Sequence, residues 1–98
     1  MEELDPVIHA QSRLRIVSTL ATLDAGESVA FPRLQELLDM TAGNLSTHLR
    51  KLEGAQYVEV CKTHRGRTPV TDLALTTRGR RAFEDYAGRL RSLLEKPT

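Results

Sequence analysis

Apolar residues change their spacing along the chain, and the changes divide it into helical and extended segments. A period near 3.6 residues is typical of an amphipathic helix, whereas alternation of apolar and polar residues is typical of a strand. Asp5-Pro6, Thr41 and Thr77 are suited to begin helices, and Gly26 to follow the end of one. The predicted elements are a helix at 6–23, a short strand at 28–31, helices at 32–39 and 42–54, strands at 57–64 and 68–75, and a helix at 78–95.

Two features of this order indicate the fold class. Only the break at Met40-Thr41 separates the two central helices, which is the spacing of a helix-turn-helix. The turn Arg65-Gly66-Arg67 joins the two strands into a hairpin with a basic tip. We predict a mainly α (α+β) winged helix-turn-helix in the order α-β-α-α-β-β-α, with a two-stranded wing and a long C-terminal helix. We take the chain as a complete gene product that forms one domain over 1–98.

The third predicted helix carries the candidate chemistry. Leu45, Leu49 and Leu52 form one apolar stripe, and small polar and basic residues occupy the other face. A major groove about 12 Å wide admits a helix whose outer face is not bulky, and Asn, Ser and Thr can bond to base edges there. A polar face exposed only to solvent is the alternative. The candidate DNA-binding residues of this helix are Thr41, Gly43, Asn44, Ser46, Thr47, Arg50 and Lys51.

The hairpin tip adds two candidates, Arg65 and Arg67. Arginine side chains are attracted to a narrow minor groove, where the electrostatic potential is most negative. The alternative is that basic residues on an exposed hairpin prevent edge-to-edge aggregation. The net charge of +1 conceals an asymmetry, because residues 1–40 carry −4 and residues 41–81 carry +5. One basic face on a nearly neutral chain favours contact with phosphates.

Composition excludes several other classes of function. Cys61 is the only cysteine, and His9, His48 and His64 lie far apart, so no metal site or disulfide within the chain is expected. No nucleophile–base pairing or glycine-rich phosphate loop is evident, and we expect neither enzyme activity nor a cofactor. Four aromatic residues are too few for stacking on single strands. The sequence has no signal peptide and no apolar membrane span, which favours a cytoplasmic protein.

Several other residues have open roles. We expect His48 to be partly buried and bonded to a neighbouring backbone group rather than in contact with DNA, and Cys61 to be structural rather than a redox switch. Arg78, Arg80 and Arg81 open the last predicted helix, where cations oppose the helix dipole. Phosphate binding, a salt bridge or simple solvation would each account for that cluster.

The first and last helices carry more apolar surface than a chain of 98 residues easily covers. Packing of the two helices against each other within one chain would cover part of it. A two-fold dimer would cover the rest, and it would present two recognition helices about 34 Å apart. The candidate dimerisation residues are Ile8, Phe83, Tyr86, Leu90, Leu93 and Leu94.

Three stretches resemble the small winged-helix transcriptional regulators of the MarR and ArsR kind. They are LQELLDMTAGNLSTHLRKLEGAQYVEV, the wing RGRTPV, and LALTTRGRRAF, and the likeness spans about residues 8–95. The chain looks closest to the short MarR-like group built of little more than the winged domain. The resemblance implies a dimer that binds DNA through the helix at 42–54 and through Arg65 and Arg67 in the wing. The resemblance does not imply an effector for this chain. The chain lacks the cysteine and histidine clusters of metal-sensing ArsR-like proteins and the longer terminal helices of typical MarR proteins.

We therefore expect a homodimeric, sequence-specific binder of double-stranded DNA that regulates transcription as a repressor or an activator, with repression preferred. A winged helix that binds another protein and no DNA is the alternative, because a fold alone does not fix function. A small-molecule effector of unknown chemistry is left open. The sequence does not identify the operator or the regulated genes.

Overall fold

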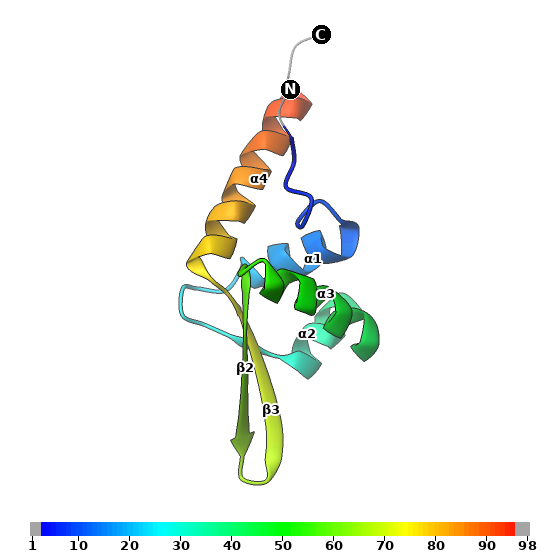
Figure 1. The fold of residues 1–98 in the computed structure, drawn as a ribbon, viewed down its shortest axis with the longest axis vertical. Helices are drawn as coiled ribbons and strands as arrows, with labels where there is room; N and C mark the ends of the chain where they lie inside the picture. Colours follow the sequence, from blue (N-terminus) through cyan, green and yellow to red (C-terminus); the bar gives the residue numbers. More distant parts are fainter. Residues whose placement is uncertain (1–2, 96–98) are drawn as a thin grey trace.

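The computed structural model describes residues 3–95. Its elements follow the predicted order, and the winged helix-turn-helix is confirmed (Figure 1). The three strands form one antiparallel sheet in the order β1-β3-β2. The elements are α1 (Gln11–Leu20), β1 (Val29–Ala30), α2 (Phe31–Leu38), α3 (Ala42–Gly54), β2 (Val58–Arg65), β3 (Thr68–Leu75) and α4 (Thr77–Glu95).

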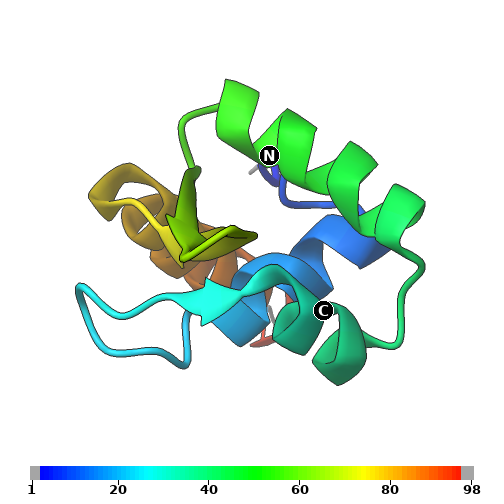
Figure 2. The ribbon, with the colours of Figure 1, turned by 90° about the horizontal axis from the view of Figure 1, so that it is seen from below.

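The hydrophobic core lies where α1, α2 and α3 meet the base of the hairpin. Leu45, Leu49 and Leu52 of α3 are buried in it, which confirms the apolar stripe predicted for this helix. Leu73 of β3 reaches the same core and pairs with Val29 of β1. Figure 2 shows the three helices packed around one another, with the hairpin directed toward the viewer. The helical face of α3 opposite its leucines is therefore left outside the core.

The first helix is shorter than predicted, because it begins at Gln11 and not at residue 6. Asp5 does organise a turn: its Oδ1 accepts a hydrogen bond from the Val7 N–H at 2.9 Å. The guanidinium of Arg13 then donates to the carbonyl of Val7 at 2.6 Å, an oxygen that a continuous helix would have used internally. Ala10 is extended, with φ −138° and ψ 129°. The hydrogen bond from Arg13 of α1 to Val7 thus replaces the helical turns that the sequence predicted before Gln11.

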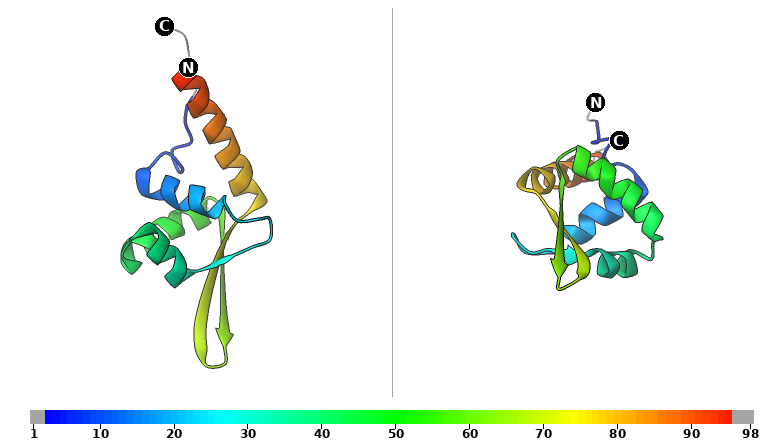
Figure 3. Two further views of the ribbon diagram at one scale, coloured as in Figure 1. Left: turned by 180° about the vertical axis from the view of Figure 1, so that it is seen from behind. Right: turned by 60° about the horizontal axis from the view of Figure 1, so that its bottom comes forward.

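The last helix is capped by Thr76 rather than by the predicted Thr77. Thr76 Oγ1 accepts from the Gly79 N–H at 2.9 Å, and its hydroxyl donates to the Gln56 carbonyl at 2.6 Å. Gly79 is buried so closely that an added Cβ would lie 2.1 Å from the carbonyl oxygen of Tyr57. The base of α4 is therefore joined tightly to the start of the hairpin, and the rest of the helix projects away from the core (Figure 3).

The segment before α1 lies beside α4 in the views of Figures 1 and 3. His9 Nδ1 is 2.8 Å from the hydroxyl of Tyr86, which is 3 % exposed. Ile8 is fully buried within the chain. Among residues 3–95, no helix is long and apolar enough to cross a membrane. The molecule is elongated, with extents of 59 × 25 × 21 Å, because α4 and the hairpin project in opposite directions (Figure 1).

Candidate nucleic-acid interface

The N-terminal half of α3 is presented to solvent. Thr41 caps it, since Thr41 Oγ1 accepts from the Asn44 N–H at 3.1 Å. Gly43, Asn44 and Thr47 are exposed, and Ser46 is half-buried. The Thr47 hydroxyl donates to the Gly43 carbonyl at 2.9 Å, so its lone pairs remain to accept from a base amino group. The side chains at this helix end are short, and they permit a close approach to base edges.

Within the described residues 3–95, the cationic side chains of the candidate site form no salt bridge. Arg50 and Lys51 on α3 are exposed, and so are Arg65 and Arg67 in the hairpin. The salt bridges within residues 3–95 are Arg33–Glu36 and Arg89–Asp85, and neither includes these four residues. Exposed cations without a carboxylate partner are available to phosphate oxygens.

Gly66 forms the hairpin turn with a φ of 66°, a backbone conformation that glycine adopts without strain. Arg65 lies opposite Thr68 in the last pair of the ladder, and Arg67 belongs to the turn. The hairpin extends well past the core, so both arginines are carried far from α4 (Figure 1). The charged tip therefore projects beyond the surface formed by α3 (Figure 1).

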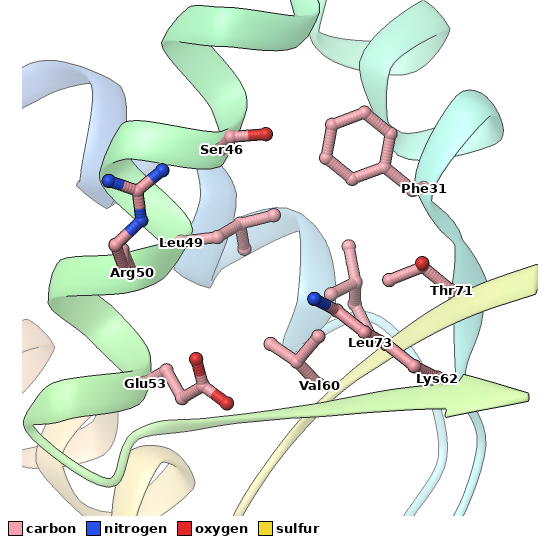
Figure 4. Close-up of a pocket in the computed structure, with 9 residues that line it drawn as sticks. All are labelled: Phe31, Ser46, Leu49, Arg50, Glu53, Val60, Lys62, Thr71 and Leu73. Atoms are coloured by element: carbon pink, nitrogen blue, oxygen red, sulfur yellow. The ribbon is translucent and has the colours of Figure 1, made fainter.

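A groove of about 590 Å³ separates α3 from the hairpin. Of its lining residues, sequence reasoning predicted only Ser46 and Arg50, and the cation it missed is Lys62, which comes from β2 and extends toward α3 (Figure 4). The signal was the alternation of β2, which places Lys62 on the same face as Val60. The groove is thus lined by basic residues from both α3 and the hairpin. Its lining residues are Phe31, Ser46, Leu49, Arg50, Glu53, Val60, Lys62, Thr71 and Leu73.

Two predicted side-chain roles change in the structure. His48 is half-buried as expected, but its Nδ1 lies 3.4 Å from Arg13 Nη1 rather than on a backbone group. Arg80 donates to the carbonyls of Ala21 (3.3 Å) and Leu23 (3.1 Å), directly after α1. Arg80 thus satisfies carbonyls left unpaired at a helix end, which explains a cation at this position without phosphate. Its neighbours in the cluster, Arg78 and Arg81, are exposed, as is Cys61.

Tyr57 connects the start of the hairpin to the N-terminal segment. Its hydroxyl donates to Asp5 Oδ2 at 2.5 Å. This hydrogen bond raises the pKa of Tyr57 above 10.0, and partial burial and the negative charge of Asp5 act in the same direction. The positive charge of Arg78 opposes the rise in pKa. The neutral phenol therefore helps to hold residues 3–10 against the base of the wing.

The candidate dimerisation residues fall into two groups. Ile8 and Tyr86 are buried within this chain, so in this conformation they do not reach a partner directly. Phe83 packs against the core and Leu90 is half-buried. Leu93 and Leu94, near the end of α4, are 40 % and 78 % exposed. The intramolecular packing of the N-terminal segment on α4 accounts for this difference.

The fold and the basic surface define a winged helix-turn-helix suited to nucleic acid, and comparisons with known proteins agree. The model of the winged helix DNA-binding domain family matches residues 12–94. The uncharacterized protein MJ0432 of Methanocaldococcus jannaschii is 42% identical over 71 residues, which cover 71% of this chain and 76% of that protein. The chain therefore belongs to the winged helix DNA-binding domain family.

Solved structures share this fold. A transcriptional regulator homologue from Pyrococcus horikoshii OT3 superposes with a TM-score of 0.82 at 27% identity, over 91% of this chain and 85% of the other. FabT of Streptococcus pneumoniae, solved in complex with DNA, has a TM-score of 0.60 at 22% identity, over 92% and 64%. The second likeness concerns the fold alone. The family match thus makes the chain a winged helix DNA-binding domain rather than an enzyme, and the MarR-like subgroup stays a prediction.

Proposed function

We propose that this protein is a homodimeric transcriptional repressor that binds a specific double-stranded DNA sequence. The observation that carries the proposal is the set of exposed cations on α3 and the hairpin that pair with no carboxylate in residues 3–95. Such groups release counterions when they meet phosphates, which supplies most of the affinity for DNA. We expect this binding in the cytoplasm, and we assign it no effector or cofactor.

In the proposed complex, the N-terminal half of α3 enters the major groove. Asn44 is exposed there and can pair bidentately with adenine, while Ser46 and Thr47 can reach other base edges. Arg50 and Lys51 lie further along the helix and contact the flanking backbone, which positions α3 without reading sequence. The arginines of the hairpin tip enter the adjacent minor groove.

The exposed leucines of α4 support the dimer. Leu93 and Leu94 lie on a projecting helix end, where an apolar surface is unfavourable in water unless a partner covers it. A second copy related by a two-fold axis would place two recognition helices on successive half-sites about 34 Å apart. Leu90 extends the proposed contact toward the core, and Phe83 supports it from within the chain.

The first experiment is fluorescence anisotropy of a labelled duplex of arbitrary sequence, titrated with the protein at two salt concentrations. We expect non-specific binding with a Kd of about 10⁻⁴–10⁻⁶ M that weakens steeply as salt rises. The variant Arg65→Ala/Arg67→Ala should bind more weakly and with a shallower dependence on salt. The variant Arg91→Ala removes one exposed positive charge from α4 without breaking a salt bridge of the described residues, and it serves as the control for loss of charge.

Selection of an operator from random duplexes then tests sequence specificity. If the wild type fails to bind any duplex at low salt, the DNA-binding proposal is abandoned. A protein partner for the same fold would then be sought.

A further inference from the structure

The groove between α3 and the hairpin combines charge with an apolar floor. Ser46, Arg50 and Glu53 are spaced at i, i+4 and i+7, so they lie along one side of α3. Lys62 of β2 is paired directly with Thr71 of β3. Directly paired residues have Cβ atoms about 4.5–5.5 Å apart, so the ammonium and hydroxyl groups can act on one ligand.

The other residues of the groove are apolar. Phe31 comes from the start of α2, Leu49 from α3, Val60 from β2 and Leu73 from β3. Figure 4 shows Lys62 extending over these side chains toward α3. Among residues 3–95 no salt bridge involves Lys62. A ligand that suits this groove therefore has an anionic group beside a compact apolar one.

A sugar–phosphate unit of DNA has this chemistry, because deoxyribose presents C–H groups next to a charged phosphodiester. The groove also lies between the two elements proposed to enter adjacent grooves of the duplex, where the strand separating those grooves must pass. We propose that this groove seats one sugar–phosphate unit of that strand. Lys62 and Arg50 are its cationic ligands, and Thr71 and Ser46 donate hydroxyl hydrogen bonds. This inference rests on the proposed function.

Glu53 determines at which end of the groove the phosphate binds. Its carboxylate lies at the end of the groove opposite Ser46, one turn of α3 beyond Arg50, and points into the space (Figure 4). A carboxylate repels a phosphate, so the phosphate is held toward the Ser46 end of the groove, away from Glu53. Glu53 thereby limits how far the protein can shift along the strand, and it weakens binding to every duplex alike.

The test compares Lys62→Gln with the wild type in the same anisotropy titration over a series of salt concentrations. One phosphate contact contributes about 0.9 to the salt slope, which corresponds to about a 3.5-fold change in Kd between 50 and 200 mM salt. We expect Lys62→Gln to lower the slope by about one and to weaken binding to all duplexes alike. Arg91→Gln, an exposed residue of α4 with the same change in charge, should leave the slope unchanged.

A second variant tests the role of Glu53. Glu53→Gln should tighten binding by about threefold, the factor expected for two unit charges roughly 7 Å apart in water. Circular dichroism and thermal melts establish that each variant is folded before it is titrated. Since Lys62 is exposed, its replacement should leave the melt unchanged.

The possible outcomes separate this inference from the proposed function. If the wild type binds DNA but Lys62→Gln has the same salt slope as Arg91→Gln, the phosphate seat is wrong and the DNA-binding proposal stands. If Glu53→Gln binds no tighter than the wild type, the directional role of Glu53 is wrong. If the wild type binds no duplex at low salt, the proposed function fails, and the seat fails with it.

Discussion

Replacing Gly79 with alanine tests the contact between α4 and the hairpin. The new Cβ would lie 2.1 Å from the carbonyl oxygen of Tyr57, 2.8 Å from its carbonyl carbon and 2.9 Å from its Cα. All three atoms belong to the backbone, so no side chain can rotate away to relieve the clash. The Tyr57 carbonyl also accepts a hydrogen bond from the Thr76 N–H at 3.0 Å, which resists its displacement. The helix or the hairpin must therefore shift.

The expected loss of stability follows from three contributions. Overpacking costs about 1–3 kcal/mol. The shift also strains two hydrogen bonds, Thr76 N–H to Tyr57 O and Gly79 N–H to Thr76 Oγ1, worth about 1 kcal/mol each. Alanine regains about 1 kcal/mol over glycine inside a helix. The net destabilisation is about 2–4 kcal/mol, which lowers the Tm of a chain of this size by about 8–30 °C.

Gly88 provides the matched control for this measurement. It lies in the same helix, and a Cβ added there would meet no atom within 4 Å. Gly88→Ala should therefore stabilise the protein by up to about 1 kcal/mol through helix propensity alone. Thermal and urea unfolding at one fixed protein concentration compare the two variants, because any dimer makes the Tm depend on concentration. If Gly79→Ala proves as stable as Gly88→Ala, the argument from close backbone packing is refuted.

Two further predictions concern other contacts of α4 and the hairpin. Tyr57→Phe should lose about 1 kcal/mol, because it removes the hydrogen bond to Asp5, which is partly open to solvent. The raised pKa of Tyr57 means that this stabilisation is complete below about pH 10 and is lost as pH rises through the folded-state pKa. Tyrosinate absorbance and urea unfolding as functions of pH check both points, and a stability difference between the wild type and Tyr57→Phe that stays the same above about pH 10 would contradict them. Leu93→Asp/Leu94→Asp should convert a dimer to a folded monomer in light scattering, whereas a persistent dimer would remove these leucines from the interface.

The order of elements could be predicted because the apolar period changes clearly along the chain. The helix at 42–54 and the strand at 68–75 have the bounds that the sequence predicted. The start of the first helix could not be predicted in the same way. The Asp5-Pro6 signal does form a local turn. The Arg13 guanidinium then donates a hydrogen bond to the Val7 carbonyl, and local helix propensity does not predict that contact.

The candidate site was predictable in part for a similar reason. Helical periodicity alone separates Asn44 and Thr47 from the buried leucines, and both are exposed. Lys62 could be placed only by the packing of the hairpin against α3, because its neighbours in the groove come from three other elements. The role of Arg80 likewise depends on carbonyls nearly 60 positions away in the chain.

The firm attachment of α4 at its base makes the helix a lever arm. Nineteen helical residues span about 28 Å, so a tilt of about 10° at one end displaces the other by about 5 Å. The N-terminus of that lever is joined to the hairpin through Gly79 and Thr76, and to the end of α1 through Arg80. A partner that binds the exposed leucines at the far end of α4 therefore sets the orientation of α3 and the hairpin, the elements proposed to contact DNA. In a dimer, a tilt of about 10° at the leucines would displace each recognition helix by about 5 Å, enough to decide which half-site spacing fits.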